Sequence, residues 1–170
     1  GSGKSTFLQT LAGRYETSDG TVKYTIDEQE IVVDEIYKHL SICAPYLELF
    51  EDYTLVESIE LQSKFKPFIE GIELSYIPEL LQLAPSKDKQ LKYYSSGMKQ
   101  RVKLGLGILA DTSILLLDEP TNNLDKNGFD WYQKLIAANS NERLIVVCSN
   151  DQAHEYEFCN ESLNIEDFKK

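Results

Sequence analysis

Hydrophobic and polar residues recur with two different periods along the chain, and these periods predict strands and helices. Two apolar runs, at 114–117 and 144–148, are far shorter than the roughly 18 residues that a membrane-spanning helix needs, so they predict buried strands. From 54 to 83 the apolar positions recur at helical spacing, with breaks at prolines and a glycine. Shorter patterns predict helices at 7–13, 97–110 and 128–138 and strands at 21–26 and 39–43.

The order of these elements predicts an α/β fold. Strand and helix alternate in the second half of the chain, which is typical of a mostly parallel sheet flanked by helices. In such a sheet, ligands bind at the carboxyl ends of the strands. The helical segment at about 54–110 is expected to form a small lobe inserted into this α/β core. We expect residues 1–170 to form a single domain.

Charge and composition narrow the possible partners. The formal net charge of -11 opposes binding to nucleic acid or to anionic lipid, because both attract basic surfaces. We therefore expect no nucleic-acid partner and no direct membrane insertion. No basic segment followed by an apolar one opens the chain, so the expected location is the cytoplasm. Cys43, Cys148 and Cys159 lack the C-x-x-C spacing of metal or redox sites and are expected to be packed free thiols.

The start of the chain fits the second part of the phosphate-binding loop G-x-x-x-x-G-K-[ST]. In such a loop, backbone N–H groups and the N-terminus of the next helix hold phosphate oxygens, and the lysine adds positive charge at the β- and γ-phosphates. A flexible glycine turn is the alternative for so short a match. Because the first glycine of the motif is absent, we expect the chain to be a fragment that starts within the loop. The residues expected to contact a nucleotide here are Gly1, Ser2, Gly3, Lys4, Ser5 and Thr6.

Two carboxylates, Asp118 and Glu119, directly follow the predicted strand at 114–117. Asp118 and the hydroxyl of Ser5 are the expected Mg²⁺ ligands, with water completing the shell, because Mg²⁺ prefers oxygen and keeps several waters. Glu119 would polarise an attacking water, a role worth about 10²- to 10⁴-fold in rate. A surface Asp-Glu pair that merely ends a strand is the alternative, and the segment PTNNLD at 120–125 argues against it.

The segment YSSGMKQR at 94–101 resembles the LSGGQ-type signature of the ABC ATPase family, and the order of all the motifs matches that family. Ser95 and Ser96 are expected to cap a helix that starts at Gly97, so that its N–H groups face an anion. An ordinary helix cap is the alternative. The resemblance implies that Ser95, Ser96 and Gly97 close on ATP held by a second copy and that Asp125 crosses the dimer seam.

Two positions depart from the family pattern. No glutamine occurs at 44–50, where the family has one, and either Pro45 or Tyr46 takes its place. Asn150 stands where the family has a histidine at the γ-phosphate, and we include it among the expected catalytic residues. An amide can donate a hydrogen bond to phosphate but cannot relay a proton at neutral pH, so we expect reduced or differently regulated hydrolysis. His154 is expected to be a surface residue on a polar helix.

The resemblance implies an ATPase subunit that hydrolyses Mg-ATP in a head-to-tail homodimer and drives transport through a separate membrane permease. The permease would dock near residues 44–60 and hold the subunit on the cytoplasmic face of the membrane. The motifs are similar to those of ABC-2-type and haem-exporter-type ATPases. Two alternatives stay open: a soluble ABC ATPase that acts in translation or on DNA, and a nucleotide-binding regulatory subunit with weak hydrolysis. The absent glutamine and histidine favour the second alternative, whereas Glu119 and Asp125 oppose it.

Overall fold

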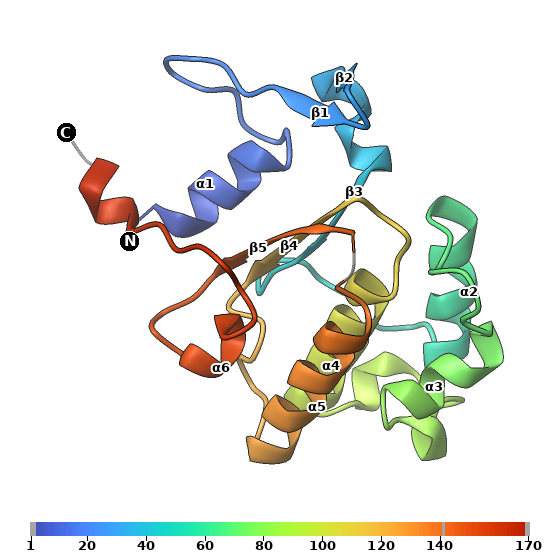
Figure 1. Cartoon of the computed structure of the whole chain (residues 1–170). Helices are drawn as coiled ribbons and strands as arrows, with labels where there is room; N and C mark the ends of the chain where they lie inside the picture. Colours follow the sequence, from blue (N-terminus) through green and yellow to red (C-terminus); the bar gives the residue numbers. More distant parts are fainter. Residues whose placement is uncertain (1–2, 141, 169–170) are drawn as a thin grey trace.

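A three-stranded parallel sheet forms the centre of the molecule (Figure 1), and the computed structural model describes residues 3–140 and 142–168. The strand order is β3 (Leu40–Cys43), β4 (Ile114–Asp118) and β5 (Leu144–Cys148), with β4 in the middle. Both neighbours of β4 are parallel to it, so the chain returns through helices between strands. The expected α/β fold with a parallel sheet is confirmed.

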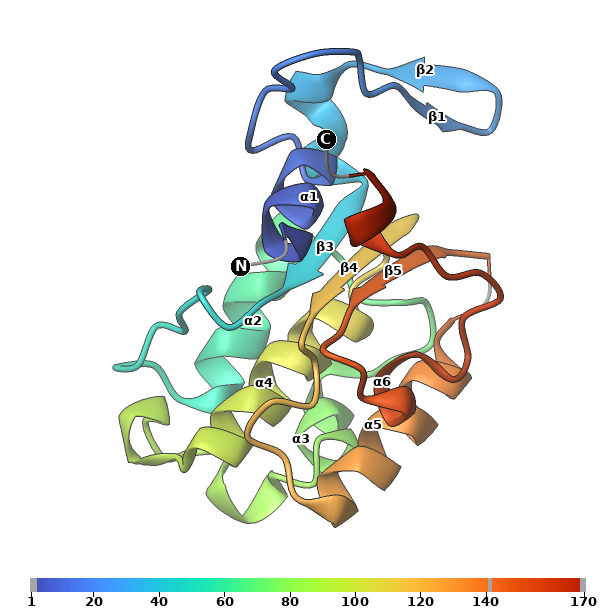
Figure 2. The ribbon, with the colours of Figure 1, turned by 90° about the vertical axis from the view of Figure 1, so that its left-hand side faces the viewer.

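Helices cover both faces of the sheet (Figure 2). Successive side chains of β4 point to opposite faces, so each face presents apolar residues for a helix to cover. Leu115 and Leu117 pack with buried residues of α4 (Ser96–Ile108) and α5 (Lys126–Ala138). Leu116 points to the other face and packs against Leu8 of α1, which spans Lys4–Leu11. Asp118 shares the register parity of Leu116, so it lies on the α1 face of the sheet.

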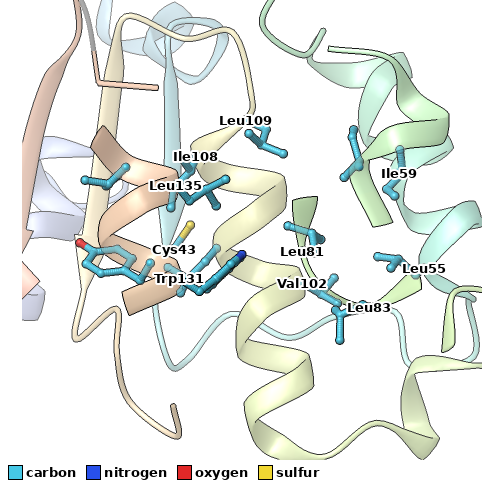
Figure 3. Packing of buried hydrophobic residues seen from close by; sticks show 14 of the residues in the cluster. Cys43, Leu55, Ile59, Leu81, Leu83, Val102, Ile108, Leu109, Trp131 and Leu135 are labelled. Carbon is cyan, nitrogen blue, oxygen red and sulfur yellow. The ribbon is translucent and has the colours of Figure 1, made fainter. Parts of the chain in front are cut away.

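The largest core cluster lies between the sheet and the helical region (Figure 3). Trp131 and Leu135 of α5 lie on one side of α4, and Leu81 lies on its other side. Gly105 of α4 permits this contact, because a Cβ at that position would come within 2.1 Å of the Leu81 side chain. The indole of Trp131 also donates a hydrogen bond of 2.8 Å to the carbonyl of Leu80. The helical region is therefore packed against the α/β core.

Short helices occupy the chain between β3 and α4. The part expected as an inserted lobe at 54–110 is helical in this structure, and its assignment as a separate lobe stays a prediction. Its longest helix before α4 is α2, and α4 itself begins one residue before the expected Gly97. The elements are α2 (Leu55–Phe65), η2 (Leu74–Tyr76), α3 (Ile77–Leu80), η3 (Ala84–Ser86) and η4 (Leu91–Tyr93).

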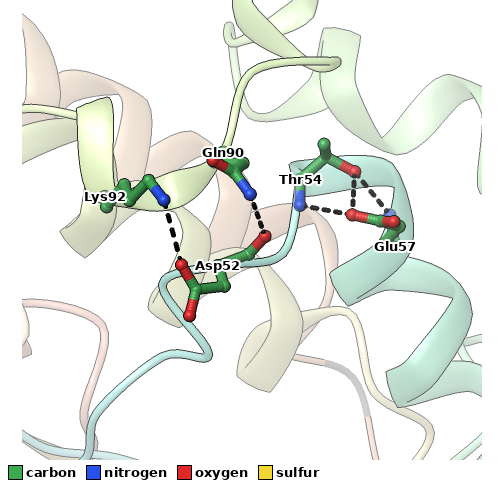
Figure 4. A network of polar contacts seen from close by, with 5 residues as sticks. All are labelled: Asp52, Thr54, Glu57, Gln90 and Lys92. Atoms are coloured by element: carbon green, nitrogen blue, oxygen red, sulfur yellow. Dashed lines mark hydrogen bonds and ion pairs between the residues drawn. The ribbon is translucent and has the colours of Figure 1, made fainter.

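A polar network fixes the start of α2 (Figure 4). Thr54 and Glu57 form a capping box, in which the Thr54 N–H donates to the Glu57 carboxylate at 2.7 Å and the Glu57 N–H donates to the Thr54 hydroxyl at 3.2 Å. Gln90 donates to the backbone carbonyl of Asp52 at 2.8 Å, and Lys92 pairs with the Asp52 carboxylate at 3.0 Å. These contacts hold the segment before α2 against the chain that leads into α4.

A small antiparallel hairpin lies at the edge of the molecule remote from the carboxyl ends of the strands (Figure 1). The strand predicted at 21–26 is shorter than expected, and its partner strand was not predicted. Asp27 and Glu28 form the turn with positive φ, which is the backbone of a tight hairpin turn. The hairpin strands are β1 (Tyr24–Ile26) and β2 (Gln29–Ile31), followed by η1 (Val33–Lys38).

The chain ends beyond β5 with two short elements, α6 (Ala153–Tyr156) and η5 (Ile165–Phe168). Within residues 3–140 and 142–168, no helix is long and apolar enough to cross a membrane.

Candidate functional site

The end of β4 and the segments that adjoin it bring several predicted residues together. Asp118 is the last residue of β4, is buried, and pairs in register with Cys148 at the end of β5. The thiol of Cys148 donates a hydrogen bond of 3.5 Å to the carbonyl of Lys4. Burial and, to a smaller extent, the Asp118 carboxylate raise the pKa of this thiol to about 11, while Lys4 opposes the change. The start of α1 and the Asp118 carboxylate therefore meet at the carboxyl edge of the sheet.

Asn150 bridges the predicted P-loop lysine and the predicted catalytic carboxylate. The Lys4 ammonium donates a hydrogen bond of 2.7 Å to Asn150 Oδ1. The Asn150 Nδ2 group donates to the carboxylate of Glu119. The amide oxygen accepts from the Lys4 cation and the amide nitrogen donates to the Glu119 carboxylate, so each end of the amide has a partner of suitable chemistry. The structure thus joins three residues that the sequence analysis assigned to separate motifs.

Glu119 holds an uncommon backbone conformation. Its φ of 46° lies in the left-handed region, which non-glycine residues seldom adopt. Its N–H donates a 2.8 Å hydrogen bond to the carbonyl of Cys148, and its own carbonyl accepts from the N–H of Asn122 at 3.1 Å. These contacts keep the start of the 119–125 loop close to the end of β5. Residues held in such conformations cluster at functional sites, and this position agrees with that tendency.

The start of α1 suits an anion. Gly3 is the N-cap of α1 with a φ of 98°, a conformation that favours glycine, and a Cβ there would meet nothing within 4 Å. Among residues 3–140 and 142–168, no side chain caps this helix, and its first turn holds no acidic residue. Ser5 is half-buried and Thr6 is exposed in that turn. Gly1 and Ser2, which the motif also includes, lie outside the described residues.

Tyr46 and Pro45, the two residues that could stand in place of the family glutamine, have different surroundings, and which of them takes that place stays a prediction. Burial raises the pKa of the Tyr46 phenol, and the Asp118 carboxylate raises it further, so the phenol lies within electrostatic reach of Asp118. Pro45 instead uses its backbone carbonyl, which accepts a 3.4 Å hydrogen bond from Lys103.

The signature segment forms the start of α4. The hydroxyl of Ser95 caps the helix by accepting from the Met98 N–H at 3.2 Å, while Ser96 is already the first helical residue. The expectation that both serines cap a helix starting at Gly97 is therefore corrected to Ser95 alone. Ser95 and Ser96 are exposed. Figures 1 and 2 place the start of α4 far from the start of α1, so one chain does not bring these two helix ends together.

The signature helix also touches the loop that follows Glu119. The buried amide of Gln100 donates a 2.7 Å hydrogen bond to the carbonyl of Pro120. A Cβ at Gly97 would lie 3.0 Å from the carbonyl oxygen of Asn123, so the glycine permits close approach of the loop. Asp125, the last residue of this loop, is exposed and is the N-cap of α5, because its carboxylate accepts from the Gly128 N–H at 2.8 Å. This capping role was not predicted, although an Asp before a helix is a common N-cap signal.

A second polar cluster beside Glu119 was not predicted. Glu155 is buried, and one of its carboxylate oxygens accepts from both the N–H and the hydroxyl of Thr121. His154 is half-buried rather than on the surface, which corrects its expected role, and it stacks on Phe129 with ring centroids 4.1 Å apart. A hollow of about 260 Å³ lies between this cluster and the side chains of Glu119 and Asn150. The residues of this cluster are distant from one another in the sequence, so the hydrophobic pattern along the chain gave no signal for the cluster.

Comparison with known proteins identifies the family, since the model of the ABC transporter family matches residues 1–122. The chain belongs to the ABC transporter family. It is 32% identical over 151 residues to human ATP-binding cassette sub-family A member 10, covering 86% of this chain and 10% of that protein. It is 27% identical over 159 residues to the mouse phospholipid-transporting ATPase ABCA3, covering 88% of this chain and 9% of that protein.

A bacterial relative and two solved structures agree with this assignment. The ABC transporter ATP-binding protein YhcH of Bacillus subtilis is 28% identical over 161 residues, covering 92% of this chain and 52% of that protein. A dimeric bacterial ABC transporter cassette has a TM-score of 0.70 at 20% identity, covering 91% of this chain and 72% of that one. A post-hydrolysis cassette bound to ADP and Pi has a TM-score of 0.72 at 19% identity, with the same coverage. At these identities the structures show the fold.

Membership of the ABC transporter family confirms the expected class of P-loop, ATP-binding domain. The chain spans about a tenth of the length of the sub-family A relatives and about half of the bacterial one. The roles of individual residues in this ABC domain stay predictions.

Proposed function

We propose that this ABC domain binds Mg-ATP and hydrolyses it between two head-to-tail copies, to drive transport through a separate membrane permease. The observation that carries the proposal is the convergence of Lys4, Asn150 and Glu119 at the carboxyl edge of the sheet, beside the buried Asp118. A cation, a neutral donor and two carboxylates at one sheet edge can bind phosphate, hold Mg²⁺ and orient a water for phosphoryl transfer.

The start of α1 would hold the phosphates. Its N–H groups face outward at the positive end of the helix dipole, and Gly3 leaves room for close approach of an anion. Lys4 would exchange its contact with Asn150 for the β- and γ-phosphates. We assign nucleotide contacts to the loop and first turn as a set: Gly1, Ser2, Gly3, Lys4, Ser5 and Thr6.

Ser5 and Asp118 would hold Mg²⁺. Asp118 is buried on the α1 face, and within the described ranges no group of three His, Cys, Asp or Glu side chains is placed to hold a metal ion. A set of one hydroxyl and one carboxylate fits Mg²⁺, which fills its octahedral shell with water and phosphate oxygens. Bound Mg²⁺ would neutralise charge on the phosphate oxygens during transfer.

Glu119 would act as the base that orients the attacking water. One oxygen of its carboxylate accepts from Asn150, and the second oxygen can accept from water. Asn150 would then turn its Nδ2 donor toward the γ-phosphate. Because an amide does not take up a proton at neutral pH, Asn150 stabilises phosphate without serving as a proton relay. The proton from water remains with Glu119 or the phosphate.

The separation of two helix ends in one chain supports the proposed dimer. The starts of α1 and α4 both offer N–H groups, and they lie far apart (Figures 1 and 2). A second copy in the opposite orientation would bring its exposed Ser95, Ser96 and Gly97 to the phosphates held by the first copy. Asp125 would lie at the seam and would retain its role as a helix cap.

The permease would dock beside the segment that joins β3 to α2. A surface hollow of about 230 Å³ lies here, lined in part by Leu47, Leu49 and Leu106. Phe50 and Tyr53 are exposed next to it, with ring centroids 5.6 Å apart. Apolar and aromatic side chains around a hollow suit an amphipathic helix. Docking here would hold the domain on the cytoplasmic face of the membrane.

A regulatory subunit with weak hydrolysis is the second candidate. The specific observation in its favour is that Asn150 engages both Lys4 and Glu119, so catalysis requires this bridge to open. The two candidates differ in turnover and share the nucleotide site.

Hydrolysis by the full-length polypeptide that carries this chain tests the proposal. We expect Mg-ATP turnover in the wild type and a loss of about 10²- to 10⁴-fold in Glu119→Gln, because the amide cannot act as a base. The control is Glu60→Gln, an exposed residue of α2, which should hydrolyse ATP at the wild-type rate. Equal turnover in wild type and Glu119→Gln would remove Glu119 from the mechanism. Nucleotide binding with negligible wild-type turnover would favour the regulatory subunit.

A further inference from the structure

Thr121 ties the loop that begins at Glu119 to α6, which follows the Asn150 segment. Its backbone N–H donates to Glu155 Oε1 at 3.0 Å, and its hydroxyl donates to the same oxygen at 2.6 Å. Glu155 is held in turn, because its own carbonyl accepts a 2.9 Å hydrogen bond from the buried hydroxyl of Tyr132. The other carboxylate oxygen of Glu155 is buried and has no hydrogen-bond partner in the part of the chain that the structure describes, so the carboxylate is anchored through Thr121.

The direction of these hydrogen bonds determines whether His154 donates or accepts. A hydroxyl has one hydrogen, and Thr121 gives it to the carboxylate of Glu155. The contact of 2.9 Å between Thr121 Oγ1 and His154 Nε2 must then run the other way, with Nε2–H as the donor. A proton therefore resides on Nε2 of His154, and three side chains form a directed chain from imidazole to hydroxyl to carboxylate.

The imidazole is also held by α5. Phe129 stacks on it with ring centroids 4.1 Å apart and an interplanar angle of 19°. Stacking restricts the plane of the ring, and the hydrogen bond to Thr121 restricts its rotation within that plane. His154 also borders the same hollow as Glu119 and Asn150. The ring is therefore fixed beside the loop that carries the proposed base.

We propose that His154 is a positioning residue for ATP hydrolysis: through Thr121 it holds the 119–125 loop in the geometry that presents Glu119 to water. This inference rests on the proposed function. It assigns no contact with nucleotide to His154, so its effect should fall on the chemical step rather than on binding. The hydrogen bond from His154 Nε2–H to Thr121 is what holds the loop, and stacking of His154 on Phe129 would not hold the loop without it.

Two substitutions at this position separate the hydrogen bond from the bulk of the side chain. In His154→Gln the side-chain amide nitrogen stands near the place of Nε2 and can still donate to Thr121, whereas His154→Leu fills the space without a donor. The matched control is His39→Leu, at the other histidine of the chain, which lies at the end of η1. All variants are made in the full-length polypeptide, and kcat and KM for Mg-ATP are measured for each.

We expect His154→Leu to lower kcat by about 3- to 10-fold, with KM within about 2-fold of wild type. His154→Gln should restore most of the lost kcat, and His39→Leu should match the wild type. Amide hydrogen exchange supplies a second readout, in which His154→Leu should speed exchange at the Thr121 N–H and leave the β1–β2 hairpin unchanged. If this hydrogen bond holds the loop, both the loss of kcat and the faster exchange at the Thr121 N–H should be observed.

Different results overturn different claims. If wild type hydrolyses ATP and depends on Glu119, but His154→Leu has wild-type kcat and wild-type exchange at Thr121, the positioning role of His154 is wrong and the proposed function stands. If His154→Gln is as slow as His154→Leu, the hydrogen bond is not the cause. If wild type shows no hydrolysis that depends on Glu119, the proposed function itself is overturned.

Discussion

The side-chain amide of Asn150 donates a hydrogen bond to the carboxylate of Glu119. The oxygen of the same amide accepts from Lys4 at 2.7 Å, so one neutral side chain bridges two groups of opposite charge. These are the groups that we assign to water and to phosphate. Opening this bridge is therefore part of the proposed catalytic cycle, and position 150 should control its rate.

We expect Asn150→His to raise ATP turnover by at least about 3-fold, because an imidazole can donate to phosphate and also take up a proton near neutral pH. Steady-state hydrolysis in the full-length polypeptide measures this. Asn160→His, at an exposed position after α6, is the control and should have no effect. Turnover and ATP-dependent dimerisation that both remain at wild-type values in Asn150→His would show that the bridge does not limit the reaction.

The link between α4 and the 119–125 loop should contribute to stability. In Gln100→Leu the carbonyl of Pro120 loses its buried donor, so we expect the free energy of unfolding to fall by about 1–3 kcal/mol. Urea denaturation measures the change. Gln90→Leu is the matched control, because its bond to the Asp52 carbonyl is exposed and water can replace it. An equal loss of unfolding free energy in both variants would mean that the buried Gln100 hydrogen bond contributes no more to stability than the exposed Gln90 one.

Much of the fold was predictable because buried strands and capped helices leave local signals. The apolar run at 114–117 followed by two carboxylates predicted β4 and the place of Asp118 and Glu119. By contrast, β2 has the polar sequence QEI, and the turn before it is formed by Asp27 and Glu28 without a glycine, so neither pattern nor turn chemistry marked the second strand of the hairpin.

The second polar cluster could not be predicted for a different reason. His154 follows a polar segment, which indicates a surface helix, yet its ring stacks on Phe129 and its Nε2 lies 2.9 Å from the Thr121 hydroxyl. Both partners come from segments that only the parallel sheet brings alongside α6. The same holds for the bridge through Asn150, whose partners are separated from it by 146 and 31 positions.

Packing of α4 against the helical region should depend on the absence of a side chain at Gly105. An alanine Cβ would come within 2.1 Å of Leu81, so Gly105→Ala should cost about 1–3 kcal/mol of folding free energy, despite the better helix propensity of alanine. Thermal or urea denaturation checks this. In a Leu81→Ala background the same substitution should cost nothing or stabilise, since the clash is gone. Additive losses in the double variant would contradict the packing seen here.

The three thiols should react in the order of their burial. Burial raises the pKa of Cys43 to about 12 and that of Cys148 to about 11, so both carry little reactive thiolate near pH 8. Cys159 is half-buried, and burial raises its pKa as well. Iodoacetamide followed by mass spectrometry should find Cys159 modified first in the folded protein and all three modified rapidly in urea. Labelling of Cys43 at the rate of Cys159 without denaturant would contradict this arrangement.

The central claim is that two copies close around ATP, with the start of α1 from one facing the start of α4 from the other. Light scattering of the full-length polypeptide carrying Glu119→Gln, with and without excess Mg-ATP, tests it most directly. We predict an ATP-dependent dimer that retains nucleotide, and a monomer when Ser96→Glu is added, because that carboxylate would repel the γ-phosphate. A strictly monomeric Glu119→Gln protein that leaves ATP unbound would contradict the account.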